Sequence, residues 1–64
     1  MVKINGEQVD IAGKTLMEFL VTTTYDLRKI AVERNGEIVP KAKYENTILQ
    51  QDDTIEVVSF VGGG

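Results

Sequence analysis

The sequence lacks cysteine, histidine and tryptophan, and it contains a single proline. Without cysteine no disulfide can form, and without cysteine or histidine the side chains that most often bind zinc, attack as nucleophiles or act as general bases are missing. Its 64 residues suffice for one small domain, whose apolar side chains are needed mainly for the core. The composition therefore argues against an autonomous enzyme.

Positive charge is also scarce, because ten acidic residues outnumber seven lysines and arginines and leave a formal net charge of −3. The cations are spread along the chain, whereas affinity for nucleic acids comes mostly from clustered cations that neutralise phosphates. No apolar stretch has the length of a membrane span or of a signal peptide. We therefore expect a cytoplasmic protein that binds neither nucleic acid nor membrane and whose partners are proteins.

The pair Asn5-Gly6 indicates a β-hairpin, since both residue types tolerate the positive φ angles of a tight turn. Apolar and polar residues alternate on both sides of this pair, over residues 2–4 and 8–11, as they do in strands with one buried face. Gly13 should end the second of these strands. The chain is thus predicted to open with a hairpin whose return strand extends to Ile11.

A helix is predicted from Thr15 onwards. Thr15 and Glu18 have the spacing of a capping box, in which each side chain binds the backbone N–H of the other residue. Leu16, Phe19 and Leu20 share one helical face, which we expect to be buried on a sheet in a helix of two to three turns. Three consecutive threonines then end the helix, because their hydroxyl groups compete for the backbone.

A second hairpin, centred on Asn35-Gly36, joins residues 30–34 to a short return strand that ends before Pro40. Because proline cannot donate to a sheet ladder, the return strand should lie at an edge. The last strand, 54–61, alternates at first and then becomes apolar on both faces, which predicts a central strand covered on both sides. We accordingly expect Phe60 to lie in the core.

The order hairpin, helix, hairpin, strand fits an α+β fold of the β-grasp (ubiquitin-like) type. This fold is a small mixed sheet of four to five strands with one main helix packed across it. Its first and last strands are adjacent, so that the connection containing the helix links the two hairpins without an unpaired central edge. We expect the domain to extend over residues 1–61 and to be followed by a flexible glycine tail at 62–64.

Acidic residues near the last strand offer the nearest approach to a metal site. Asp52, Asp53 and Glu56 lack the spacing of a calcium loop, so a turn rich in aspartate is the better explanation, and no metal is expected. We expect four other charged side chains to be solvated, namely Arg34, Glu37, Lys41 and Lys43.

The unusual feature is the end of the sequence, where an apolar strand runs into Gly62, Gly63 and Gly64. Three glycines reach about 10 Å when extended and can pass through a channel that any Cβ would block. The Gly64 α-carboxylate is ionised at neutral pH and can attack the α-phosphate of ATP held by a partner enzyme. Val61 is then expected to contact that partner. The alternative is a linker remnant or a frayed terminus without function.

The whole sequence resembles the ThiS group of ubiquitin-like sulfur carriers, which is related to the molybdopterin sulfur carriers MoaD. Three stretches carry the resemblance: VKINGEQVDI, TLMEFL and AVERNGEIVPKAKYENTILQQDDTIEVVSFVGGG. The resemblance implies a β-grasp fold whose terminal diglycine carries the function. Tyr44 stands where many relatives have tryptophan, which is a conservative change for a packing residue.

The resemblance further implies that the chain is not an enzyme but the covalent substrate of one. A ThiF-like enzyme would adenylate Gly64 with its own ATP and magnesium, and a sulfur donor such as a persulfide enzyme would convert Gly64 to a thiocarboxylate. Thiazole synthase would then receive the sulfur for thiamine biosynthesis, and the chain needs no cofactor of its own. Two alternatives stay open: a non-covalent β-grasp binding module, and a carrier or ubiquitin-like modifier of another pathway.

Overall fold

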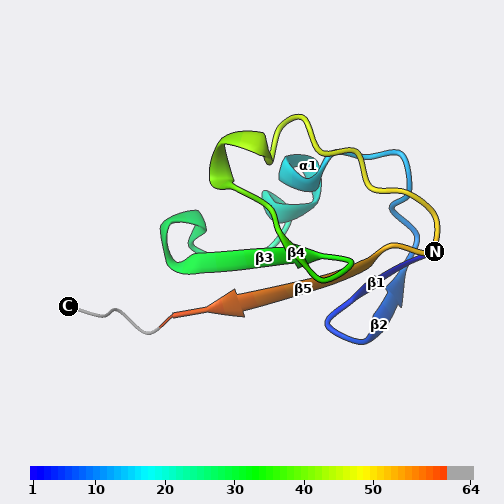
Figure 1. Cartoon of the computed structure of the whole chain (residues 1–64), viewed down its shortest axis with the longest axis horizontal. Helices are drawn as coiled ribbons and strands as arrows, with labels where there is room; N and C mark the ends of the chain where they lie inside the picture. The colour runs from blue at the N-terminus through cyan, green and yellow to red at the C-terminus, as the bar shows by residue number, and fades with distance from the viewer. Residues whose placement is uncertain (61–64) are drawn as a thin grey trace.

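The computed structural model describes residues 1–60 as a five-stranded sheet with short helices on one side (Figure 1). The strands are β1 (Val2–Ile4), β2 (Glu7–Val9), β3 (Ile30–Arg34), β4 (Glu37–Ile38) and β5 (Thr54–Ser59). The helices are the α-helix α1 (Leu16–Leu20) and the 3₁₀-helices η1 (Leu27–Lys29) and η2 (Lys41–Lys43). No helix in this part of the chain is both long and apolar enough to span a membrane.

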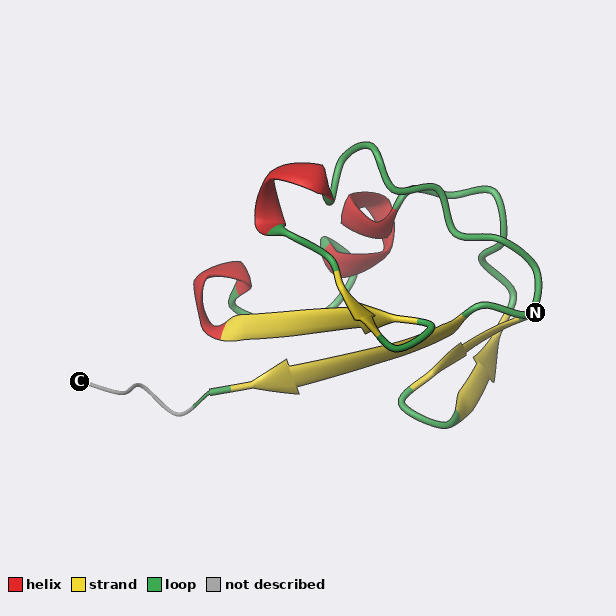
Figure 2. Cartoon of the chain, in the orientation of Figure 1, coloured by secondary structure: helices red, strands yellow, loops and turns green. Residues whose placement is uncertain are grey.

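The strand order is β2-β1-β5-β3-β4, and β1 and β5 are parallel whereas the other neighbouring pairs are antiparallel. The first and last strands are therefore adjacent, and β4 before Pro40 lies at an edge, as the sequence predicts. Figure 2 shows α1 and both 3₁₀-helices on the same side of the sheet. The predicted mixed sheet of the β-grasp type, crossed by one α-helix, is confirmed.

Both Asn-Gly pairs form the predicted turns, with φ angles of 49° and 87° at Asn5 and Gly6. The return strand β2 nevertheless ends at Val9, two residues before the predicted limit. Its last partner is Val2, the first residue of β1, and the Met1 carbonyl before it accepts from the Asp52 N–H at 2.8 Å instead of pairing with β2. Ile11 lies beyond the strand but is half-buried against the core, as its place in the alternating pattern predicted.

The capping box at the start of α1 is confirmed. The Glu18 N–H donates to Thr15 Oγ1 at 3.1 Å, and the Thr15 N–H donates to Glu18 Oε1 at 2.7 Å. With five residues α1 is shorter than predicted, because the Thr22 and Thr23 hydroxyls donate to the carbonyls of Phe19 and Leu20, at 2.7 Å and 2.6 Å, directly after it.

The core lies between the sheet and α1. Leu16 and Leu20 of the helix are buried and Phe19 is half-buried, so the predicted helical face does cover the sheet. Tyr44 is buried as a packing residue, and burial raises the pKa of its hydroxyl. The other buried hydrophobic residues are Val2, Ile4, Ile30, Val32, Leu49, Ile55 and Val57.

The central strand β5 is covered on one face only, which contradicts the prediction of two covered faces. Ile55 and Val57 are buried, whereas Glu56 and Val58 are exposed, so burial alternates from Thr54 to Val58, and the last residue, Ser59, is exposed as well. Phe60 continues the exposed set and is 52% exposed, so its predicted place in the core is wrong. The physical reason is that the helices all lie on one side, and no segment of residues 1–60 covers the other.

Candidate functional site

The predicted functional residues Val61, Gly62, Gly63 and Gly64 lie outside the described residues. The predicted limit between domain and tail at residues 61 and 62 also lies there. What the structure does describe is the strand that leads to them. β5 ends at Ser59, and the Phe60 N–H still donates to the Lys29 carbonyl at 2.7 Å.

An exposed apolar patch lies on the open face of the sheet directly before these residues. Val58 is 58% exposed and lies opposite the half-buried Ala31 of β3, and Phe60 follows on the same face. Glu56, two residues before Val58, lies opposite Glu33 of β3 in the sheet, and both glutamates are exposed. This face thus offers a partner protein apolar contacts near the end of β5 and negative charge beside them.

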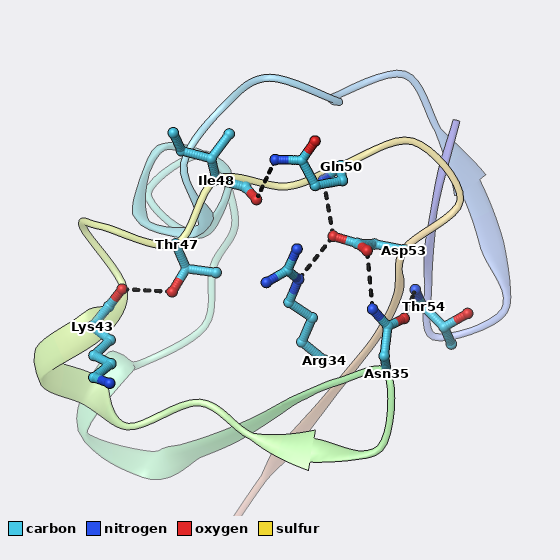
Figure 3. Close-up of polar contacts among 8 residues, drawn as sticks. All are labelled: Arg34, Asn35, Lys43, Thr47, Ile48, Gln50, Asp53 and Thr54. Atoms are coloured by element: carbon cyan, nitrogen blue, oxygen red, sulfur yellow. Dashed lines mark hydrogen bonds and ion pairs between the residues drawn. The ribbon is translucent and has the colours of Figure 1, made fainter.

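The opposite end of β5 holds a buried polar cluster that the sequence analysis missed (Figure 3). Asp53 Oδ2 accepts from Arg34 Nε and from the Gln50 N–H, both at 2.8 Å, and Asp53 Oδ1 accepts from Asn35 Nδ2 at 3.0 Å. The Asn35 Oδ1 in turn accepts from the Thr54 N–H at 2.8 Å. The cluster ties the β3–β4 turn to the start of β5.

The Asp53 side chain is only 8% exposed, and burial by itself disfavours the charged carboxylate. The hydrogen bonds from Gln50 and Asn35 and the Arg34 guanidinium outweigh that effect and hold the pKa of Asp53 below its usual value. Because both Asp53 oxygens already accept hydrogen bonds from the protein, this residue serves the fold rather than a calcium ion. Within residues 1–60, no three acidic, histidine or cysteine side chains are grouped so as to hold a metal.

The prediction that Arg34 is solvated is wrong, because its guanidinium is only 32% exposed and pairs with Asp53. The other three charged residues of that prediction are exposed: Glu37, Lys41 and Lys43. A signal for the pair was present in the sequence, since the Asn-Gly turn places Arg34 at the end of β3 beside the start of β5. Its partner was not evident, because Asp52 and Asp53 both fit a turn.

A cleft of about 310 Å³ opens beside this cluster, between β4 and the segment after Pro40. Its ionisable lining residues are Arg34, Glu37 and Lys43, and the Thr47 hydroxyl donates to the Lys43 carbonyl at 2.7 Å. The lining offers two cations and one carboxylate, with no nucleophile beside a general base. The lining of this cleft therefore does not support a catalytic site there. The end of β5 is the stronger candidate for a functional site.

Comparison with known proteins decides the family. A match to the ThiS family extends over residues 2–64. The chain belongs to the ThiS family. The sulfur carrier protein ThiS of Bacillus subtilis is 36% identical over 66 aligned positions that cover all of both chains. A crystal structure of ThiS from Geobacter metallireducens has a TM-score of 0.78 at 28% identity and covers 98% of this chain and 97% of its own.

The family assignment confirms both the resemblance and the fold. The relatives that match this chain over the whole length of both proteins are named sulfur carrier proteins, not enzymes. A thiazole synthase of Paramagnetospirillum magneticum is 44% identical over 62 residues, which are 95% of this chain but 19% of that protein. The chain spans about a fifth of the length of the thiazole synthases that it matches.

Proposed function

We propose that this ThiS-family chain is a cytoplasmic sulfur carrier of thiamine biosynthesis and that Gly64 carries the sulfur. The observation that supports this most strongly is the family match, because it continues to residue 64 and thus includes the three glycines. The similarity to a protein named sulfur carrier protein ThiS, over the whole of both chains, supports the same role.

The chemistry begins with the Gly64 carboxylate, which is a weak nucleophile and a poor acceptor until it is activated. One carboxylate oxygen attacks the α-phosphorus of ATP on a ThiF-like enzyme, and pyrophosphate leaves, so that an acyl-adenylate forms. The outer sulfur of a persulfide on a donor enzyme then attacks the acyl carbon and displaces AMP, which leaves Gly64 joined to the donor as an acyl disulfide. A second cysteine thiolate of the donor or of the partner enzyme attacks the donor's sulfur in that disulfide, forms a disulfide with it and releases Gly64 as a thiocarboxylate, in which one oxygen is replaced by sulfur. ATP and magnesium belong to the partner, and the carrier brings no cofactor.

The three glycines suit this role for a steric reason. Glycine has no Cβ and adopts φ angles closed to other residues, so Gly62 to Gly64 can enter a narrow active site in an extended form. The exposed Val58 and Phe60 supply apolar area for docking the domain outside that site. Recognition and reaction would thus use neighbouring residues in the sequence.

Thiazole synthase is the acceptor that we propose for the sulfur. Two relatives that are each 44% identical to this chain are named thiazole synthase, which associates a domain of this type with that enzyme. The alternative is a β-grasp module that binds a partner without covalent chemistry. The two candidates differ in whether a free carboxylate at Gly64 is required.

ATP–pyrophosphate exchange tests the proposal directly. The chain should support exchange only with a cognate ThiF-like enzyme and MgATP, and adding one alanine after Gly64 should abolish exchange while leaving binding to the enzyme in place. Exchange that persists with the extended chain, or ATP turnover by the isolated chain, would contradict the carrier function. Binding without any exchange in the wild type would favour the non-covalent module.

A further inference from the structure

The Asn5 side chain extends the β-sheet beyond the end of β1. Its Oδ1 accepts from the Val57 N–H at 2.7 Å, and its Nδ2 donates to the Val57 carbonyl at 3.2 Å. In a parallel ladder these two groups of Val57 would bind two different residues of the neighbouring strand. Since β1 ends at Ile4, the amide of Asn5 binds both groups in place of that missing backbone.

Two further contacts hold Asn5 in place, one from its backbone and one from its side chain. The Asn5 N–H donates to the Ile55 carbonyl at 2.9 Å, which anchors the backbone beside β5. The Val57 N–H can only donate, so the oxygen of the amide must face it and the nitrogen must face the Val57 carbonyl. The nitrogen also lies 3.3 Å from the hydroxyl of Tyr25, which is half-buried and packs against the core.

The other hairpin turn uses the same residue type for a matching contact. Asn35 has a φ of 53°, close to the 49° of Asn5, and its Oδ1 accepts from the Thr54 N–H at 2.8 Å. The two turn asparagines therefore both bind β5 through their side chains. They differ in place: Asn35 holds the first residue of the strand, and Asn5 holds the fourth.

The position of the Asn5 contact relates it to the functional end of the chain. Among the described residues, Val57 is the last one in β5 that receives hydrogen bonds from the β1 side, and Phe60 is held from the β3 side alone, by Lys29. Four residues separate Val57 from Gly62 in the sequence. Up to Val57 the strand is thus held from both sides, and beyond it, as far as Phe60, from the β3 side, so Asn5 is the last described residue that restrains β5 from the β1 side.

We propose that Asn5 is a positioning residue for the activation of Gly64. By holding Val57 from the β1 side, it limits the movement of the end of β5, the strand that leads to Gly64. Attack on ATP needs a near-attack geometry, and a reacting group that reaches it less often reacts more slowly. This inference rests on the proposed carrier function, and it assigns to Asn5 a part in the reaction without contact to the reacting atoms.

The test compares Asn5→Gly with Asn35→Gly in the full chain. Glycine accepts the positive φ of both turns, so each variant loses only the side-chain amide and keeps the hairpin. Both should melt earlier than the wild type. At a temperature well below both transitions, Asn5→Gly should lower kcat/KM for adenylation roughly tenfold, whereas Asn35→Gly should stay within about twofold of the wild type.

Hydrogen exchange of the free chain provides a readout that does not depend on the partner enzyme. In Asn5→Gly the Val57 and Phe60 amides should exchange about tenfold faster or more, and in Asn35→Gly the effect should centre on Thr54. Equal losses of kcat/KM in the two variants, or unchanged exchange at Val57 and Phe60, would overturn the positioning role. A wild-type chain that is never adenylated would instead refute the carrier function, while the exchange data would still decide whether Asn5 holds the strand.

Discussion

Replacing Asp53 by asparagine should be among the most destabilising single changes of a polar residue in this domain. Asparagine keeps the shape of aspartate and one acceptor oxygen, which can still serve Arg34 and Gln50. Its NH₂ group then faces Asn35 Nδ2, which is also a donor, so one buried hydrogen bond is lost. The bond from Arg34 also loses its charge assistance, and a half-buried guanidinium is left without a counter-ion.

One lost hydrogen bond costs about 1 kcal/mol, and the weakened charged bond adds about 1–2 kcal/mol, which together lower the free energy of unfolding by about 2–3 kcal/mol. For a domain of this size that corresponds to a drop of about 10–20 °C in Tm. Thermal melts followed by circular dichroism at pH 7 measure this shift directly. A change of no more than about 2 °C would refute the reasoning and would place the Arg34 pair among ion pairs of negligible effect.

Asp26→Asn is the matched control. Asp26 also pairs with an arginine, Arg28, but at the surface, where the Arg28 side chain is 83% exposed. Its carboxylate additionally accepts from the Arg28 N–H at the start of η1, a cap that asparagine can replace. The Tm of Asp26→Asn should therefore stay close to that of the wild type.

The effect of Asp53→Asn should also depend on pH. The pKa of Asp53 is held below its usual value in the folded protein, so the contacts of its charged form stabilise the fold above the unfolded-state pKa and are lost as the pH falls through the folded-state pKa. The difference in stability between the wild type and Asp53→Asn should thus be full at pH 7 and shrink below about pH 4. A difference that stays constant down to pH 2 would contradict a role for the charge.

Two further predictions separate the fold from the function. Leu20→Ala should lower the free energy of unfolding by about 2–5 kcal/mol in urea melts, because Leu20 is fully buried between α1 and the sheet; a loss under about 1 kcal/mol would contradict the close packing of this helix. Gly63→Val and Gly64→Val should each block adenylation although the carboxylate remains, and deleting both glycines should abolish it with little change in Tm, since glycine has no side chain to bury. Adenylation of both valine variants at the wild-type rate would refute the argument for a narrow channel.

Local signals in the sequence predicted most of the fold. The two Asn-Gly turns, the capping box at Thr15 and the edge strand before Pro40 each depend on neighbours within a few residues, and each was confirmed. The helix ended sooner than its apolar pattern predicted, because the hydroxyls of Thr22 and Thr23 bind the carbonyls of its last turn. Strand β2 ended at Val9 because Met1, the residue before β1, binds Asp52 rather than β2, which the sequence of β2 alone cannot show.

Errors arose where a residue's environment depends on distant segments. The apolar end of β5 predicted cover on both faces, but whether Val58 and Phe60 are covered depends on where every helix packs. Their exposure has a simple interpretation in a carrier, since apolar residues near the reacting end can contact a partner. The same limit hid the buried pair of Arg34 and Asp53, which are 19 residues apart in the sequence.

The role of Asn5 was also hidden, although its turn was predicted. The positive φ of the turn already accounts for an asparagine at this position. Nothing in the local sequence indicates that its side chain also binds another strand. Only the adjacency of β1 and β5, 52 residues apart at the contact with Val57, brings the amide to the strand. The candidate tail was predicted from a local signal, three glycines after an apolar strand, and it stays a prediction because it lies outside the described residues.

Intact mass spectrometry of the chain tests the central claim most directly. The wild type would be incubated with a cognate ThiF-like enzyme, MgATP and a persulfide sulfur donor, and its mass would be compared with that of the chain extended by one alanine after Gly64. The carrier function predicts that one oxygen is replaced by sulfur in the wild type, that fragmentation places the sulfur on Gly64, and that the extended chain is unchanged. A wild-type mass that never changes, while a proven ThiS carrier is converted by its own enzyme under the same conditions, would contradict the account.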